Sequence, residues 1–517
     1  MQAGSGNTQS LWQATATAPI YTNLQEDARA DVVIVGAGIA GLSCAYALAQ
    51  RGREVIVLDE GLIGSGETAR TTAHLACGLD DRYYQLEKLH GADGARLAAE
   101  SHAAAITWIE RVVNEAQIDC DFTRVPGYLI LGADTSPAEL DREHEASSRS
   151  GLQTERLRNF LALGRQVDGG ALRFDEQAQF HPLRYLAGLA EAGRKAGVRI
   201  FTHTRAREVV GGDDAHVTTD GGLRVHAGAI IVATNSPMND RLVIHTKQAA
   251  YRTFVIAMPI QAPVERCLIW DTEDPYHYVR TWHDGNDDRT WLIVGGEDHK
   301  TGQPEHETGA FARLADWTRS RLGIDAPVRY SWSGQVLEPN DGLAFIGHNP
   351  MDKDNVYIVT GDSGNGMTHG TIAALLLPDL IDGAEHPWAP LYAPARKQLR
   401  GISEFVRENA NVAAQYVQLA TPGEIVDARD IANGSGAIMR QGLKKIAVYR
   451  DRDGALHMHS AICTHLGCVV HWNSVESSWD CPCHGSRYDP VSGAVISPPA
   501  VAPLARIDDE AVGDRAA

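Results

Sequence analysis

Short apolar runs alternate with helix-like stretches along most of the chain, from about residue 31 to residue 400. Such alternation is typical of an α/β domain, in which helices cover the faces of a sheet. The runs that predict strands are Asp31–Val35, Glu54–Leu58, Ala229–Ala233, Trp291–Val294 and Val356–Val359. Residues 1–30 are polar with little periodicity, and we expect them to form a lead-in to this domain.

The pattern changes after residue 400. A proline-rich segment, AEHPWAPLYAP, is followed by a helical pattern over Val406–Val417, which predicts a linker helix within residues 401–421. Short strand-like runs then follow one another at close spacing. These runs are EIVDARD, KKIAVYRD and ALHMHSAICTH. They predict a small all-β domain over residues 422–517, after an α/β domain that spans residues 31–400.

A glycine-rich turn follows the first predicted strand. In DVVIVGAGIAGLSCAYALAQRGREVIVLDEG, the turn glycines are Gly36, Gly38 and Gly41. Strand, glycine turn, helix and second strand together form a dinucleotide-binding unit, because the glycines let backbone N–H groups approach a pyrophosphate. Asp59 lies eighteen residues after Gly41, where an acid accepts hydrogen bonds from ribose hydroxyls, and the adjacent Glu60 is the alternative. The fingerprint alone does not distinguish FAD from NAD.

Three other segments favour a flavin. GSGETARTTAHLACG follows the second strand, where flavoproteins of the glutathione reductase type pass beneath the isoalloxazine ring. AIIVATNSP resembles the strand that returns the chain to an FAD domain. VYIVTGDSGNGMTHGTIAA predicts a helix whose positive N-terminal end faces the flavin pyrimidine. The expected flavin-site residues are Thr71, Thr72, His74, Ala233, Gly364, Gly366, Met367 and Thr368.

Four of the eight cysteines lie close together near the end of the chain, in CTHLGC and CPCHGSRYD. The spacing is C-x-H, fifteen residues, then C-x-x-H. Two thiolates on one iron and two imidazoles on the other make a Rieske [2Fe–2S] cluster. The expected ligands are Cys463, His465, Cys481 and His484. A Cys2His2 zinc site is the alternative, but it leaves the other two cysteines unexplained.

The segments before residue 400 resemble the FAD-dependent amine and amino-acid oxidoreductases, which include D-amino acid oxidase and glycine oxidase. The resemblance is greatest to a γ-glutamylputrescine-oxidase-like branch, in which some members carry an appended Rieske domain. The strings that carry it are TTAHL, PYHYVR, GGEDHKTG, WSGQ and SGNGMTHG. It implies a Rossmann-type FAD domain with an inserted α+β substrate domain. For His74 it implies either a covalent link to the flavin or an ordinary place in the flavin pocket.

The cluster motif resembles the Rieske proteins of cytochrome bc and b6f complexes. This resemblance implies a disulfide between Cys468 and Cys483, and a proline loop, Ser497–Pro499, that closes over the cluster. It also implies hydrogen bonds from Ser486 to a bridging sulfide and from Tyr488 to a cysteine sulfur. Because such bonds stabilise the reduced cluster, we expect a potential of about +100 to +300 mV. No two-histidine, one-carboxylate iron site is recognisable, which disfavours a Rieske oxygenase.

Candidate substrate residues lie in PYHYVR and WSGQ. Tyr278 and Arg280 alternate with Val279, so they share one strand face, and Arg280 would hold a substrate carboxylate with two hydrogen bonds. His277 and Gln335 are further candidates. The alternative is that all four are ordinary sheet and ion-pair residues.

The charge balance excludes some partners. The chain has 47 Lys and Arg against 66 Asp and Glu, a net charge of −19, so it repels phosphate backbones and anionic lipid. No apolar run approaches the length of a membrane helix, and the first residues lack the basic start and apolar core of a secretory signal. We therefore expect a cytoplasmic protein with no nucleic-acid or membrane partner.

Together the two cofactors predict oxidation of a C–N bond in a small amine or amino acid. Electrons would pass from reduced FAD to the Rieske cluster and on to an external acceptor. Two alternatives remain. In one, electrons enter through the cluster and feed a reductase or a monooxygenase-type flavoprotein. In the other, the chain is a non-catalytic redox sensor or electron-transfer module.

Overall fold

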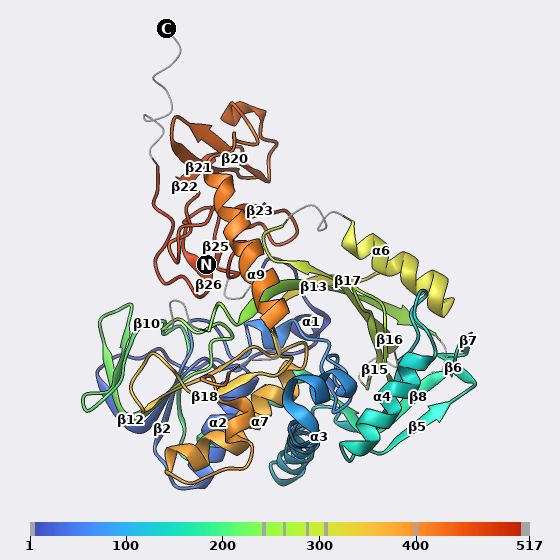
Figure 1. Cartoon of the computed structure of the whole chain (residues 1–517). Coiled ribbons are helices and arrows are strands. Elements are labelled where there is room, and N and C mark those ends of the chain that lie inside the picture. Colours follow the sequence, from blue (N-terminus) through green and yellow to red (C-terminus); the bar gives the residue numbers. More distant parts are fainter. Residues whose placement is uncertain are drawn as a thin grey trace.

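The computed structural model describes residues 6–239, 244–261, 265–285, 289–303, 309–397 and 402–507, with the backbone alone for residues 402–406 and 408. Figure 1 shows an α/β body and a smaller, strand-rich C-terminal domain, with helix α9 running up towards the latter. No helix in these ranges combines the length and the apolarity needed to cross a bilayer.

The first sheet of the body carries the predicted dinucleotide unit. Its strands are β1 (Ala28–Val35), β2 (Val55–Leu58), β9 (Arg199–Phe201), β10 (Ala206–Val210), β11 (His216–Thr219), β12 (Arg224–Val232), β18 (Phe345–His348) and β19 (Val356–Thr360). The order is β10-β11-β12-β1-β2-β9, with β19 beside β12 and β18 beside β19. The pairs β1–β2, β1–β12, β2–β9 and β12–β19 are parallel, so their carboxyl ends meet at one edge.

Helices cover this sheet. They are α2 (Ile39–Gln50), α3 (Tyr83–Glu115), α5 (Pro182–Lys195) and α7 (Gly366–Ile381), with α8 (Ala389–Tyr392) near by. Strand β2 is buried along its whole length, because helices shield both faces of a parallel sheet. α2 and α7 approach closely at Gly370, where a Cβ would lie 3.2 Å from the amide nitrogen of Ala40.

A second, mostly antiparallel sheet is inserted into the body. Its strands are β3 (His74–Leu75), β4 (Thr123–Ile130), β5 (Thr154–Leu157), β8 (Ala171–Gln179), β13 (Gln248–Ile260), β14 (Leu268–Asp271), β15 (Tyr278–Asp284), β16 (Arg289–Lys300) and β17 (Tyr330–Pro339). The order is β17-β13-β16-β15-β14-β4-β8-β3. Smaller elements attached to this part are α4 (Ala138–Arg149), α6 (Ala310–Trp317), η3 (Thr318–Leu322), β6 (Phe160–Ala162) and β7 (Arg165–Val167). The predicted α/β body with an inserted α+β part is confirmed.

The C-terminal domain consists of two small sheets. The elements are β20 (Ser435–Gln441), β21 (Lys444–Arg450), β22 (Leu456–Ser460), β23 (His471–Asn473), β24 (Ser478–Asp480), β25 (Arg487–Tyr488) and β26 (Val495–Ser497). Before them run α9 (Ile402–Gln415) and η4 (Tyr416–Leu419), within the predicted linker. The all-β prediction is confirmed.

One predicted strand-like run, EIVDARD, does not form a strand. It makes a single bridge, Ile425 with Met439, and then a short 3-10 helix, η5 (Ala428–Asp430). The Asp427 side chain accepts a hydrogen bond from the amide of Arg429 at 2.8 Å. Such local side-chain bonds to the backbone compete with strand pairing.

Candidate functional site

A cavity of about 1350 Å³ opens at the carboxyl edge of the first sheet. Ligands of open α/β sheets bind at this edge. Most of the predicted flavin-site residues line the cavity. These are Gly36, Gly38, Asp59, Glu60, Thr71, Thr72, His74, Ala233, Gly364, Gly366 and Met367. Gly41 and Thr368 lie behind the lining.

The glycine turn has the shape that a pyrophosphate cradle needs. Gly36 has φ +107°, and a Cβ there would lie 2.4 Å from the carbonyl oxygen of Ala233. A Cβ on Gly41 would lie 1.9 Å from the carbonyl oxygen of Gly36, so only glycine lets α2 pack against the turn. The residues present therefore fit the diphosphate of a dinucleotide.

Asp59 holds this turn in place. Its carboxylate accepts hydrogen bonds from the amides of Ala37 at 2.6 Å and Gly61 at 2.8 Å. Burial raises the pKa of Asp59, and the two backbone donors oppose that effect. The neighbouring Glu60 is half exposed and lies 3.4 Å from the Nε of Arg205.

The N-terminus of α7 opens on the other part of the cavity, since Gly364, Gly366 and Met367 all line it. Its positive end is placed to favour negative charge there. The carboxyl of Asp362 lies in the same turn, where it accepts a hydrogen bond from the amide of Leu337 at 3.3 Å. Burial raises the pKa of Asp362 to about 7. Thr368 instead faces α3 and lies 2.8 Å from the Nδ1 of His102.

Aromatic side chains line the cavity near Thr72 and His74. Trp270, Tyr276 and Tyr278 come from β14 and β15 and the turn between them, and the two tyrosine rings lie 5.4 Å apart. The Tyr276 hydroxyl donates to Asp80 at 3.1 Å, and Asp80 lines the cavity as well. Burial raises the pKa of Asp80, opposed by the charge of Arg82 and the Tyr276 hydrogen bond. This end of the cavity therefore offers π faces and a carboxyl group.

His74 lies edge-on to Tyr278, with ring centroids 5.8 Å apart. Its Nδ1 lies 3.0 Å from the Thr72 hydroxyl and its Nε2 lies 3.3 Å from the Val279 carbonyl oxygen. Burial and the charge of Arg280 lower the pKa of His74 to about 3, so it is a neutral imidazole. Each ring nitrogen has a hydrogen-bonding partner in the described structure.

Arg280 does not line the cavity, although Tyr278 on the same strand does. Its Nη1 donates to three carbonyl oxygens, those of Thr72 (3.0 Å), Ala73 (2.8 Å) and Phe180 (3.1 Å). Burial lowers the pKa of Arg280 to about 9. Strand β15 therefore passes under the turn at residues 72–73 where Arg280 lies. The Arg280 guanidinium supports this flavin-site turn and is not presented to a substrate carboxylate.

His277 also lies outside the cavity lining. Its Nδ1 is 3.1 Å from an Asp271 carboxylate oxygen, and its ring stacks on Trp317 at 4.3 Å. Burial opposes its charge, but hydrogen bonds to Asp271 and Glu297 raise the pKa of His277 to about 9. It forms a structural ion pair. The fourth candidate, Gln335, does line the cavity.

The predicted cluster ligands lie on two loops of the C-terminal domain. A disulfide joins Cys468 to Cys483, as the resemblance implied. The rings of His465 and His484 lie 5.0 Å apart, and the Nδ1 of His484 is buried without a hydrogen-bond partner in the described structure. The two loops thus carry two thiols and two neighbouring imidazoles, which is the donor set of a Rieske cluster.

Residues around the ligands support this fit. The Tyr488 hydroxyl lies 3.1 Å from the Sγ of Cys463, as expected for a hydrogen bond to a ligand sulfur. Ser486 is fully buried and accepts a hydrogen bond from the amide of Ala500 at 3.1 Å. That bond ties the proline segment 497–499 to the second ligand loop.

The imidazole side of the cluster site faces the α/β body. The His245 ring, just before β13, lies 5.1 Å from the His465 ring and 5.9 Å from the His484 ring. Gln335 on β17 donates its Nε2–H to the carbonyl oxygen of Gly485 at 3.0 Å. Gln335 therefore touches both the wall of the large cavity and the residue next to an expected cluster ligand.

Comparison with protein families now agrees with this geometry. Residues 31–380 match the family model described as FAD dependent oxidoreductase. The chain belongs to this family. Residues 422–508 match the Rieske [2Fe-2S] domain, so this oxidoreductase combines an FAD domain with an iron–sulfur domain. The cofactors FAD and [2Fe–2S] are those that the sequence predicts.

Similar proteins align with nearly the whole chain or with about three quarters of it. The chain is 32% identical to the putative Rieske 2Fe-2S iron-sulfur protein YhfW of Bacillus subtilis, over 97% of each chain. It is 27% identical to γ-glutamylputrescine oxidoreductase of Escherichia coli, over 73% of this chain and 89% of that one. The structure of glycine oxidase from Geobacillus kaustophilus aligns with a TM-score of 0.59 at 19% identity, covering 72% of this chain and 99% of that one, and shows the shared fold.

Several residues of the site escaped sequence reasoning. Asp80 follows closely on the segment GSGETARTTAHLACG, and Tyr276 stands within PYHYVR, so proximity to those strings was an available signal. Trp270 and His245 belong to no motif. Their places depend on how β13 and β14 pair within the second sheet.

Proposed function

We propose that this oxidoreductase oxidises a small cationic amine and passes the electrons through its own Rieske cluster to an external acceptor. FAD, when bound, accepts the two electrons of C–N oxidation, whereas a Rieske cluster carries one at a time. The observation that carries the proposal is the Gln335–Gly485 contact, because it joins the wall of the FAD cavity to a cluster-ligand loop.

The four expected ligands, Cys463, His465, Cys481 and His484, would hold the cluster on the side of the Rieske domain that contacts the FAD domain. His245 packs against both ligand imidazoles. This close packing supports electron transfer within the chain, since it leaves no solvent layer to cross between the ligand rings and the FAD domain.

The lining of the cavity supports an amine without a carboxylate. Among the described residues that line it, the lysines and arginines are Arg70 and Arg205. Arg70 pairs with Glu476 at 2.9 Å, and Arg205 lies beside Glu60. At the aromatic end, Asp80 and the π faces of Tyr276 and Tyr278 are suited to an ammonium group.

Asp80 would also accept the proton that the substrate ammonium loses. Oxidation takes a hydride equivalent from the carbon next to nitrogen, and the ammonium must first lose a proton. The raised pKa of Asp80 suits this carboxylate to accept that proton. Water then hydrolyses the imine. The name of the E. coli relative, γ-glutamylputrescine oxidoreductase, supports oxidation of an amine, whereas the absence of a carboxylate on the substrate is inferred from the cavity lining alone.

Anaerobic mixing tests both parts of the proposal. The holoprotein is mixed with primary amines and, in parallel, with amino acids of the same carbon skeleton. Flavin bleaching is followed optically and cluster reduction by electron paramagnetic resonance. We expect an amine to bleach the flavin and the Rieske signal to rise afterwards.

Three other outcomes of this experiment contradict parts of the proposed function. Bleaching by amino acids alone rejects the amine. Bleaching without a Rieske signal rejects electron transfer within the chain. Flavin reduction that occurs only after an external reductant has reduced the cluster reverses the direction of electron flow.

A further inference from the structure

We infer that the Rieske domain forms one wall of the FAD site and that Glu476 holds it there. FAD would then be enclosed between two domains and would leave only when the Rieske domain undocks. This inference concerns retention of the cofactor, so it stands whether or not an amine is the substrate.

The cavity itself is lined from both domains. On the Rieske side its lining runs along the segment 489–501 and includes Asp489, Ser492, Val495, Ser497, Pro498 and Ala500. Opposite them lie Glu60 and Arg205 of the FAD domain, and Arg205 Nη1 donates to the carbonyl oxygen of Val495 at 3.0 Å. The segment therefore covers the part of the cavity beside Asp59 and Glu60, where the fingerprint places the ribose of the adenosine.

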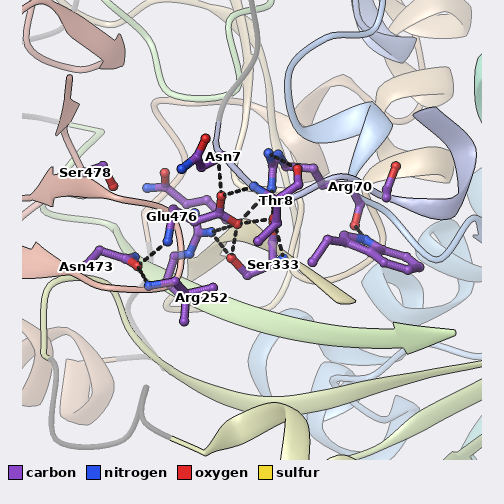
Figure 2. Close-up of polar contacts among 12 residues, drawn as sticks. Asn7, Thr8, Arg70, Arg252, Ser333, Asn473, Glu476 and Ser478 are labelled. Carbon is purple, nitrogen blue, oxygen red and sulfur yellow. Dashed lines mark hydrogen bonds and ion pairs between the residues drawn. The ribbon is translucent and has the colours of Figure 1, made fainter. Parts of the chain in front are cut away.

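Glu476 lies at the centre of the contact between the domains (Figure 2). It follows β23 in the Rieske domain, and its carboxylate is fully buried among residues of the FAD domain. Oε1 accepts hydrogen bonds from Arg70 Nη1 at 2.9 Å and from the Ser333 hydroxyl at 2.5 Å. Arg252 Nη2 lies 3.3 Å from the same oxygen. One carboxylate thus lies against two buried guanidinium groups.

The N-terminal segment completes the contact. The amides of Asn7 and Thr8 donate to Glu476 Oε2 at 2.5 and 2.9 Å, and the Thr8 hydroxyl donates to Oε1 at 2.6 Å. Figure 2 shows these donors converging on the glutamate from the side opposite Arg252. The lead-in of the chain therefore helps to hold the Rieske domain against the FAD domain.

Arg70 links this contact to the cofactor site. It belongs to the segment 64–78, which lines the cavity, and it lines the cavity together with Glu476. Its carbonyl oxygen accepts a hydrogen bond from Trp332 Nε1 at 2.8 Å. Loss of the Glu476 charge removes the carboxylate that Arg70 and Arg252 share and leaves both guanidinium groups buried, which favours separation of the two surfaces.

Glu476→Gln is the decisive variant, because it keeps the size of the side chain and removes its charge. We expect FAD to dissociate about tenfold faster or more from the E476Q holoprotein than from the wild type. Release is followed as the rise of free-FAD fluorescence after gel filtration. Limited proteolysis between residues 415 and 422 reports undocking. Electron paramagnetic resonance reports whether the Rieske domain remains folded with its cluster.

Glu424→Gln is the matched control. Glu424 is a glutamate of the same domain that lies 3.7 Å from the Nδ1 of His471, but it is half exposed and lies away from the cavity. E424Q should release FAD at the wild-type rate.

A second variant undocks the domains without touching a buried charge. Gly302 has φ +71°, and a Cβ there would lie 2.8 Å from the backbone nitrogen of Pro482 in the Rieske domain. Gly302→Ala should therefore also accelerate FAD release, and it replaces E476Q if that variant does not fold. If limited proteolysis shows that the domains have undocked but FAD is released at the wild-type rate, the inference that the Rieske domain forms a wall of the FAD site is overturned. Wild-type docking in E476Q would overturn the role of Glu476.

Discussion

At the scale of single residues, the structure separates side chains that the string PYHYVR presents together. Tyr278 lines the cavity, whereas His277 and Arg280 are committed to an ion pair and to backbone carbonyls. Asp80, on another segment, supplies the carboxyl group of that region. Chemistry at this site therefore depends on which polar groups line the cavity, and the sequence string alone does not show that.

Asp80→Asn should lower kcat/KM for an amine about 10- to 100-fold, because a charge-assisted hydrogen bond to the ammonium is lost. Since burial raises the pKa of Asp80, wild-type kcat/KM should rise with pH through that pKa as the carboxylate forms, and D80N should lack this limb. Rapid-mixing flavin reduction across pH measures both. Asp81→Asn is the control, since Asp81 bonds Ser363 at 2.7 Å and does not line the cavity. Equal losses in the two variants would contradict an ammonium contact.

His277 gives a prediction about stability, which should fall as the pH rises. Its pKa is raised from 6.5 to about 9, so its ion pair contributes fully below pH 6.5 and is lost as pH rises through about 9. The contribution is on the order of 3 kcal/mol. Denaturant unfolding should therefore show wild-type stability falling across this window, with His277→Gln less stable at pH 6 and nearly independent of pH. Flavin reduction by substrate should survive in H277Q, and its loss would restore His277 as a catalytic candidate.

At the scale of elements, the apolar runs predicted the strands of the first sheet, whereas one short run and the contacts of one strand residue could not be predicted from the pattern. The apolar runs at residues 31–35, 54–58, 229–233 and 356–359 all lie in or largely in strands of the first sheet. The run EIVDARD failed as a strand, and there the Asp427 side chain accepts a hydrogen bond from the backbone amide of Arg429. Arg280 could not be assigned from strand alternation, since alternation gives the face of a strand but not the turn that covers it.

The turn between β1 and α2 allows a direct test. Gly36→Ala should abolish FAD binding, because a Cβ would collide with the Ala233 carbonyl oxygen and φ is +107°. The purified variant should lack the flavin absorbance and keep the Rieske signal. Gly52→Ala is the control: its φ is +78°, but nothing lies within 4 Å of a Cβ there, so it should cost about 1 kcal/mol and retain FAD. Flavin retained in G36A would contradict the cradle.

At the scale of the whole molecule, the position of the Rieske domain is the feature with most consequence. Its ligand loops pack on β13 and β17 of the FAD domain, so the cluster site and the FAD cavity share a wall. This arrangement supports the proposal that electrons leave the flavin through the cluster.

Removal of the cluster tests this exit. Cys481→Ser should eliminate the Rieske signal and lower turnover with a one-electron acceptor by about 100-fold or more, because the cluster carries electrons singly. The rate of anaerobic flavin bleaching by substrate should stay within about twofold of wild type if FAD remains bound. Steady-state and single-turnover measurements separate the two effects. Undiminished turnover in C481S would show that the acceptor takes electrons directly from the flavin.

The sequence by itself determined the two cofactors, the fold class and the order of the domains. Those features depend on local spacing: glycines that permit a turn, and thiols and imidazoles carried on two short loops. Only the tertiary structure decided that Glu476 meets Arg70 and Arg252, that Gln335 reaches Gly485, and that Arg280 is covered. These contacts join residues far apart in the chain, and they arise from sheet register and domain docking, which no local pattern of residues encodes.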